Sequence, residues 1–122
     1  MLVLAILAAG FSDPDRIQRD ITKHVRLVVQ GKEDSIWILR KISKPYKDER
    51  ILAMWKMHTP LETKVSLLLS LGKPCTDRGR KLLEDCSYEG KPRQLRSVAM
   101  TALGRYKEAS ALMPPVRIPP PN

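Results

Sequence analysis

The sequence predicts an all-α protein, built from short antiparallel helices that stack as helical hairpins or form an irregular helical bundle. Only 5% of the residues are aromatic, so Leu, Ile, Val, Met and Ala must build the core, which suits interlocking helices better than a sheet. Apolar residues recur at helical spacing in several segments. Proline and glycine separate these segments at positions where helices begin and end. The 122 residues have the length of one domain.

An apolar run at residues 1–9 begins the chain, and we interpret it as a buried first helix. A signal peptide would carry a basic residue before its apolar run, and none precedes this one. At about nine residues the run is also far shorter than the roughly 20 needed to span a bilayer. We therefore expect an intracellular protein, in the cytoplasm or the nucleus.

The next two predicted helices follow each other almost without a linker. Pro14 suits the first turn of one helix, and Gly31 suits its C-terminal end. The stretch "KEDSIWILRKIS" forms the second helix, which ends before Lys44-Pro45 because a residue that precedes proline disfavours helix. By composition residues 36–39 could form a strand, but the acidic start and the helical neighbours favour a helix.

Five more helical segments complete the domain. Apolar residues recur on one side of "YKDERILAMWKMHT". Thr59 and Glu62 then match a capping box, Pro60 stands at the first helical position, and Gly72 ends that helix. A further helix is predicted from about residue 77 to residue 87, and "QLRSVAMTALGRY" contains the next one before a last short helix.

The predicted domain boundary lies close to the C-terminus. Residues 1–113 form a single α-helical domain, and residues 114–122 form a Pro-rich extended tail. Prolines supply no backbone N–H groups, so this tail cannot join a helix or a sheet, and polyproline II is expected.

Small residues mark the helix within residues 94–106. Ala99 and Ala102 let a neighbouring helix axis come close. The larger side chains of Leu95, Val98 and Leu103 are expected to fill the grooves of that neighbour.

Two segments share a pattern 32 residues apart, since "KVSLLLSLGK" aligns with "RSVAMTALGR" and superimposes Leu71-Gly72 on Leu103-Gly104. The stretch "LRSVAMTALGR" resembles the second helices of HEAT-like repeats, which often read Val-Arg, small apolar residues and Ala-Leu-Gly. The resemblance covers residues 46–112 and implies stacked helical hairpins. The earlier segment "SIWILRKIS" has no Leu-Gly pair, and the alternative is an irregular bundle with one Ala-rich helix.

The net charge of +9 indicates a polyanionic partner. An excess of this size attracts anions over a Debye length of about 8–10 Å. Nucleic acid, an acidic protein or an anionic membrane surface could each be the partner that this positive charge attracts. The alternative is a basic subunit whose charge is neutralised in a larger assembly.

One group of cations lies in the helix predicted after Pro14. These residues are Arg16, Arg19, Lys23 and Arg26. At about 100° per residue they fall on one side of the helix, away from the apolar stripe that faces the core. Like charges at this spacing destabilise a helix by a few tenths of a kcal/mol per pair. An anionic partner would explain the arrangement, and a merely solvated face is the alternative.

A second basic group surrounds the turn between the two helices that follow Gly72. We expect its binding residues to be Arg78, Arg80, Lys81, Lys91, Arg93 and Arg96. On stacked hairpins they would flank one turn and line one edge of a groove. Phosphate contacts there would be salt-sensitive and largely independent of sequence. Few aromatics are available for stacking, so a duplex or structured RNA backbone fits better than base readout.

No pattern in the chain predicts catalysis. A Gly-rich phosphate loop, a Gly-x-Ser-x-Gly elbow and a His-Glu-x-x-His helix are all missing. Paired acidic residues such as Asp48 and Glu49 stand beside basic ones and are assigned to polar faces or helix starts. We therefore expect no enzyme activity and no catalytic residues.

The cysteines and histidines do not form a zinc signature, so we expect neither a metal nor another cofactor. A disulfide between Cys75 and Cys86 is geometrically conceivable. Cys86 follows two leucines at helical spacing, however, and is better interpreted as a small buried residue. Two reduced thiols are expected.

These observations predict a non-enzymatic basic helical protein that binds a polyanion, foremost the RNA or DNA backbone. The alternative is a protein-interaction or assembly subunit that uses a helical groove and the apolar N-terminal helix, with an acidic protein or a second copy as partner. Association with a membrane surface, through the basic helix and the N-terminal run, ranks below both.

Overall fold

The computed structural model describes residues 14–57 and 60–112. All regular structure in these two ranges is helical, which confirms the predicted all-α class. The helices are α2 (Pro14–Val29), α3 (Glu33–Arg40), α4 (Pro45–Met57), α5 (Leu61–Leu71), α6 (Asp77–Cys86), α7 (Arg93–Ala102) and α8 (Tyr106–Leu112). The apolar run at residues 1–9 and the predicted tail at residues 114–122 lie outside the described residues.

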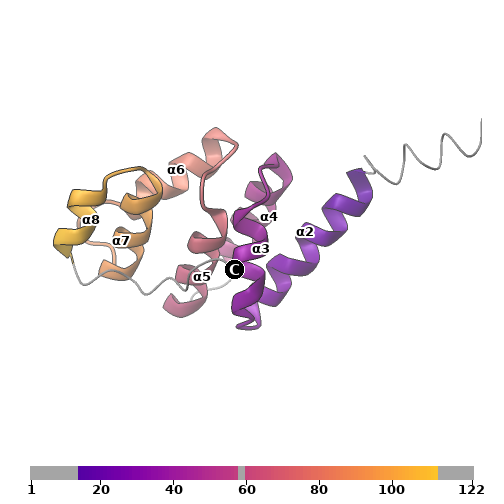
Figure 1. The fold of residues 1–122 in the computed structure, drawn as a ribbon. Helices are drawn as coiled ribbons and strands as arrows, with labels where there is room; N and C mark the ends of the chain where they lie inside the picture. Colours follow the sequence, from indigo (N-terminus) through magenta and orange to yellow (C-terminus); the bar gives the residue numbers. More distant parts are fainter. Residues whose placement is uncertain (1–13, 58–59, 113–122) are drawn as a thin grey trace, which may run out of the picture.

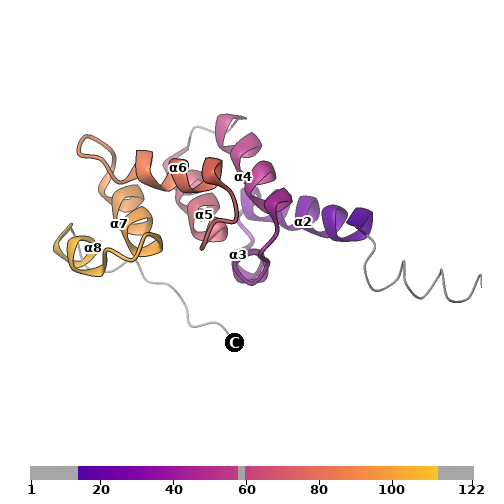
Figure 2. The same ribbon diagram turned by 90° about the horizontal axis from the view of Figure 1, so that it is seen from above.

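The helices pair, and the pairs stack side by side. α2 contacts α3, α4 contacts α5, and α6 contacts α7. Between pairs, α2 contacts α4 and α4 contacts α6, while α3 contacts α5 and α5 contacts α7. The helices therefore form two layers, one of α2, α4 and α6 and one of α3, α5 and α7, with α8 packed on α7 (Figures 1 and 2).

The core is centred on α5, which contacts α2, α3, α4 and α7. Leu67, Leu68 and Leu71 of α5 are fully buried. Ile21 and Val25 of α2 are fully buried as well. The predicted apolar stripe of α2 thus faces the core, and burial of each such side chain contributes about 1.5–3 kcal/mol to folding.

One of the two small residues of α7, Ala99, is buried as the close packing predicted from the sequence requires. Ala99 is fully buried, and Leu95 and Val98 are buried in the same helix. Ala102 and Leu103 are only half-buried. Because α7 ends at Ala102, Leu103 already belongs to the turn that leads to α8.

Glycines end three of the helices. Gly31 (φ 88°) follows α2, Gly72 (φ 54°) follows α5 as predicted, and Gly104 (φ 82°) follows α7. After α2 the amide of Lys32 donates to the carbonyl oxygen of Leu27 at 3.0 Å, a bond typical of the Schellman motif. This left-handed backbone is accessible to glycine without strain.

Helix α5 begins one residue later than predicted. Its first residue is Leu61, and Pro60 occupies the N-cap position without a side-chain hydrogen bond. Thr59, the first residue of the predicted capping box, lies outside the described residues. In contrast, Pro45 is the first residue of α4, and residues 36–39 lie in helix α3 rather than in a strand.

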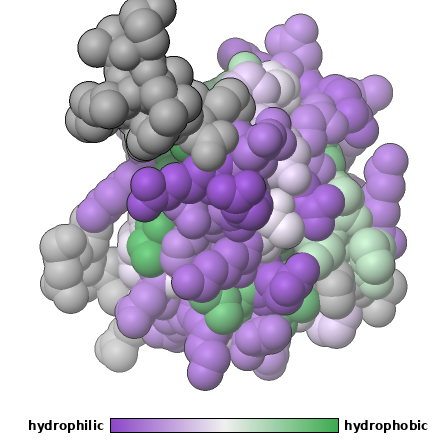
Figure 3. Space-filling view, turned by 90° about the vertical axis from the view of Figure 1, so that its right-hand side faces the viewer, coloured by the Kyte–Doolittle hydropathy of each residue, from purple (hydrophilic) through white to green (hydrophobic). Residues whose placement is uncertain are grey.

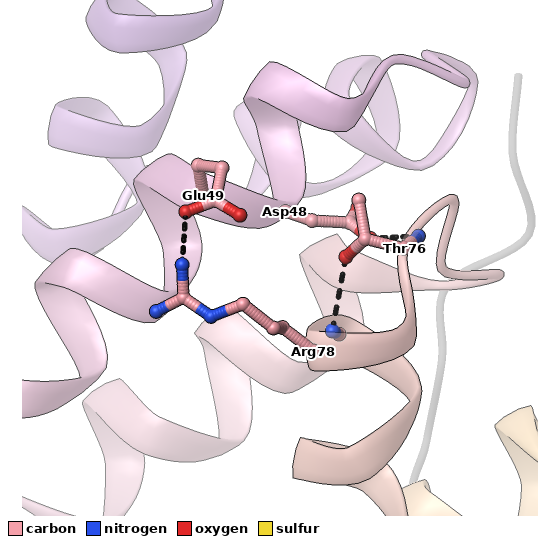
Figure 4. A network of polar contacts seen from close by, with 5 residues as sticks. Asp48, Glu49, Thr76 and Arg78 are labelled. Atoms are coloured by element: carbon pink, nitrogen blue, oxygen red, sulfur yellow. Dashed lines mark hydrogen bonds and ion pairs between the residues drawn. The ribbon is translucent and has the colours of Figure 1, made fainter.

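Two charged residues of α4 belong to the core, and Asp48 lies in the first turn of that helix rather than on a polar face. Lys47 and Asp48 are 1% and 0% exposed. Asp48 Oδ2 accepts a hydrogen bond from the amide of Cys75 at 2.8 Å. It also accepts hydrogen bonds from the Thr76 amide (2.9 Å) and the Thr76 hydroxyl (2.8 Å) (Figure 4). Lys47 Nζ donates to the carbonyl oxygen of Leu39 at 3.1 Å. Burial lowers the pKa of Lys47, although the neighbouring Asp48 carboxylate acts in the opposite direction.

Asp48 and Thr76 together join two hairpins. The Thr76 hydroxyl donates to Asp48 and also accepts a hydrogen bond from the Gly79 amide at 3.0 Å, which caps the N-terminus of α6. An N-cap of this kind stabilises a helix by about 1 kcal/mol. The start of α6 is therefore fixed against α4 by side-chain contacts that no local pattern contains.

Candidate nucleic-acid interface

The basic face of α2 consists of Arg16, Arg19, Lys23 and Arg26. All four side chains are exposed, while the opposite side of the helix packs into the core. Figure 3 views the side of the molecule from which α2 projects in Figure 1, and its surface is mainly hydrophilic. The amphipathic arrangement predicted for α2 is present.

An open hollow of about 450 Å³ lies between the basic face of α2 and the first turn of α4. We call it the α2 hollow. Its lining residues are Asp15, Gln18, Arg19, Thr22, Lys23, Arg26 and Tyr46. The Thr22 Oγ1 and Tyr46 OH atoms are hydrogen-bonded at 3.1 Å. The α2 hollow thus combines three cations and the carboxylate of Asp15 with neutral hydroxyl and amide groups. Phosphate oxygens accept hydrogen bonds from the cationic, hydroxyl and amide donors.

The second predicted basic group is not gathered at one turn. Arg78 stands near the N-terminus of α6, whereas Lys91 follows the C-terminus of that helix. α6 has 10 residues and is therefore about 15 Å long. Arg78 Nη1 instead pairs with Glu49 Oε2 of α4 at 2.7 Å (Figure 4).

The remaining residues of this second group are distributed over α6 and α7. Arg80 pairs with Glu84 at 3.4 Å within α6, and Lys81 is exposed on the same helix. Lys91 lines a separate hollow of about 350 Å³. Arg93 is exposed at the start of α7, and Arg96 is half-buried.

The local charge balance distinguishes α2 from α6. α6 contains three acidic and three basic residues, so its charges cancel within the helix. α2 contains four Arg and Lys residues against two Asp residues. Of these two helices, α2 therefore carries the larger net positive charge.

Four residues of the α2 hollow were not among the predicted binding residues: Asp15, Gln18, Thr22 and Tyr46. Asp15 and Thr22 stand four residues before Arg19 and Arg26, and Gln18 stands four residues before Thr22, so the helical periodicity contained this signal. Tyr46 comes from α4, and no local pattern connects it to α2.

Residues 14–57 and 60–112 contain no group of three or more His, Cys, Asp and Glu side chains arranged to hold a metal ion. Cys75 and Cys86 are free thiols, the first exposed and the second buried as predicted. None of the seven described helices has the length and apolar character that crossing a membrane requires.

No family model matches the chain, and no curated protein and no solved structure matches it.

Proposed function

We propose that this protein binds the phosphate backbone of an RNA or DNA duplex through the basic face of α2 and the α2 hollow. The observation that supports the proposal is the single row of exposed cations on α2, three of which also line the α2 hollow. The net charge of +9 would draw a polyanion toward this surface.

The dimensions of the row suit a nucleic-acid backbone. Arg16 and Arg26 are ten residues apart in a continuous helix, which corresponds to about 15 Å along its axis. Duplex DNA presents one negative charge per roughly 1.7 Å, so several phosphates would lie within a Debye length of about 8 Å of the row. Arginine guanidinium groups bind phosphate oxygens in a bidentate manner.

The same surface offers little for reading bases. Tyr46 is the aromatic residue among those that line the α2 hollow, and its hydroxyl is hydrogen-bonded to Thr22. Sequence-specific recognition of single strands depends on aromatic platforms and on donors aimed at base edges. We therefore expect contacts to the backbone and little dependence on nucleotide sequence.

The test measures how binding to a short labelled duplex of mixed sequence depends on salt. One variant removes three of the four positive charges of the basic face by Arg16→Gln, Lys23→Gln and Arg26→Gln. The matched control removes the same charge elsewhere by Lys56→Gln, Lys73→Gln and Lys107→Gln. The control residues are all exposed, and none of them lines the α2 hollow. Circular dichroism checks that both variants fold.

Each phosphate contact contributes about −0.9 to the slope of log K against log salt. The α2 variant should therefore lose about 2 to 3 from the magnitude of the wild-type slope, and the control should keep most of it. Equal losses in the two variants would show that binding follows the total charge. A flat salt dependence in the wild-type protein would contradict phosphate binding altogether.

A further inference from the structure

An open groove of about 620 Å³ lies between α5, α7 and α8, with the end of α3 at its border. We call it the α5–α7 groove. Its apolar lining consists of Leu68, Leu69, Val98, Ala102, Leu103 and Ala109. Leu69, Ala102 and Leu103 are only half-buried. Apolar surface thus remains accessible to a ligand in this groove.

The rim of the α5–α7 groove is cationic. Arg40 and Lys73 line it and are exposed, and no acidic side chain is among the described residues that line the groove. Arg40 Nη1 donates to the carbonyl oxygen of Leu69 at 2.8 Å, and the guanidinium lies 5.6 Å from the ring centroid of Trp37. These two contacts hold the charge of Arg40 at the groove.

An exposed aromatic side chain completes the groove. Tyr106, the first residue of α8, also lines it and is 65% exposed. Tyrosine and arginine are the residue types that most often dominate the binding energy of protein interfaces. A central apolar surface with a polar rim is the usual anatomy of such an interface.

We propose that the α5–α7 groove binds an acidic peptide segment of another protein, with apolar side chains of the peptide against Leu69, Ala102 and Leu103. Its carboxylates would meet Arg40 and Lys73. The proposal rests on charge complementarity between a groove without acidic residues and a partner that supplies them.

Other occupants complement the groove less well. Residues 113–122 of this chain contain no acidic side chain, and residues 1–13 contain Asp13 alone, so neither segment offers a run of acidic side chains. A nucleic-acid backbone would leave the apolar lining without a partner. Tyr106 is the aromatic residue that the described lining offers for base stacking.

This inference is independent of the function proposed for α2. No residue lines both the α5–α7 groove and the α2 hollow. The α5–α7 groove belongs to the layer of α3, α5 and α7, whereas α2 belongs to the other layer. Each proposal can therefore fail without the other.

The probe is a labelled synthetic peptide of glutamates with leucine at every third or fourth position, titrated with the full chain and followed by fluorescence anisotropy. A second peptide carries lysine in place of glutamate, and a third has glutamate at all positions. We expect saturable binding of the first peptide and much weaker binding of the other two. If the all-glutamate peptide bound as tightly as the first peptide, charge alone would account for binding, and the proposal would be overturned. The proposal would also be overturned if the first peptide showed no saturable binding.

A pair of variants tests the location. Lys73→Glu with Ser110→Glu makes the charge of the groove lining negative, and both residues are exposed. Ala53→Glu with Lys56→Glu makes the same change of charge on exposed positions of α4. The first variant should bind the acidic leucine peptide about tenfold more weakly or worse, and the second should bind like the wild-type protein. Equal losses in the two variants would overturn the proposal.

Two further measurements need no change in the groove. In NMR spectra of the wild-type protein, the peptide should shift the amide signals of Val98, Ala102 and Tyr106 and leave those of α2 in place. The α2 triple-glutamine variant should bind the peptide as the wild-type protein does. Shifts centred on α2, or loss of peptide binding in that variant, would assign the peptide to the polyanion surface and contradict a separate site.

Discussion

Gly79 lies so close to the carboxylate of Asp48 that no side chain fits between them. A Cβ atom on Gly79 would lie 2.5 Å from Asp48 Oδ2 and 3.1 Å from Pro74 Cβ. The carboxylate is fully buried and is held by the amides and hydroxyl of residues 75–76. α6 can approach α4 this closely because residue 79 is glycine.

The change Gly79→Ala should destabilise the protein, although alanine has the higher intrinsic helix propensity. Alanine in a helix interior is favoured over glycine by about 1 kcal/mol, but overpacking a fixed buried group costs about 1–3 kcal/mol. We expect a lower free energy of unfolding in urea. In an Asp48→Ala background the loss should shrink or reverse, and a stabilising Gly79→Ala in the wild-type background would contradict the close contact.

Asp48 and Glu49 are adjacent carboxylates that should differ strongly in their effect on stability. Asp48→Ala leaves three donors without their acceptor, so we expect a loss of about 3 kcal/mol or more. Glu49 pairs with Arg78, but the two side chains are 45% and 61% exposed (Figure 4). Such a pair contributes about 0–1 kcal/mol. Urea unfolding of Asp48→Ala and Glu49→Ala measures the difference, and similar losses would show that Asp48 is not the connection between the hairpins.

The thiol of Cys86 should make stability fall at alkaline pH. Burial raises the pKa of Cys86 from 9.0 to about 11, although nearby Lys91 lowers it. The folded state therefore holds this proton more tightly than the unfolded state. The resulting stabilisation is complete below pH 9.0 and is lost as the pH rises to about 11.

The loss linked to Cys86 should be on the order of 2 kcal/mol. Urea unfolding across this pH range should show a shallower decline for Cys86→Ala than for the wild-type protein. Cys75→Ala serves as the control because Cys75 is exposed, and it should follow the wild-type curve. A decline that is equally steep in Cys86→Ala would assign the titration to another group.

Sequence periodicity predicted the helices and much of the core because both depend on neighbours within one or two turns. Ile21 and Val25 follow from the spacing of apolar residues in α2, and the exposed cations follow from the same spacing. Gly31 and Gly104 are equally local signals, since a helix end needs left-handed backbone there. In these segments, local chemistry and tertiary packing require the same structure.

The rest of the site and of the core depends on residues that are distant in the chain. Asp48 stands among charged neighbours, and its burial depends on donors 27 and 28 residues away. Tyr46 reaches the α2 hollow from another helix, and Arg40 reaches the α5–α7 groove from α3. Arg78 was expected to join a basic cluster and instead pairs with Glu49. Such contacts become visible once the hairpins are stacked.

The contacts of Arg40 reduce its conformational freedom before any ligand arrives. A free arginine loses roughly 2 kcal/mol of rotamer entropy when it is immobilised. Here the Leu69 carbonyl and the Trp37 ring already restrict the guanidinium. An anion that meets Arg40 would therefore encounter a preorganised charge, and less of the interaction energy would be lost to ordering.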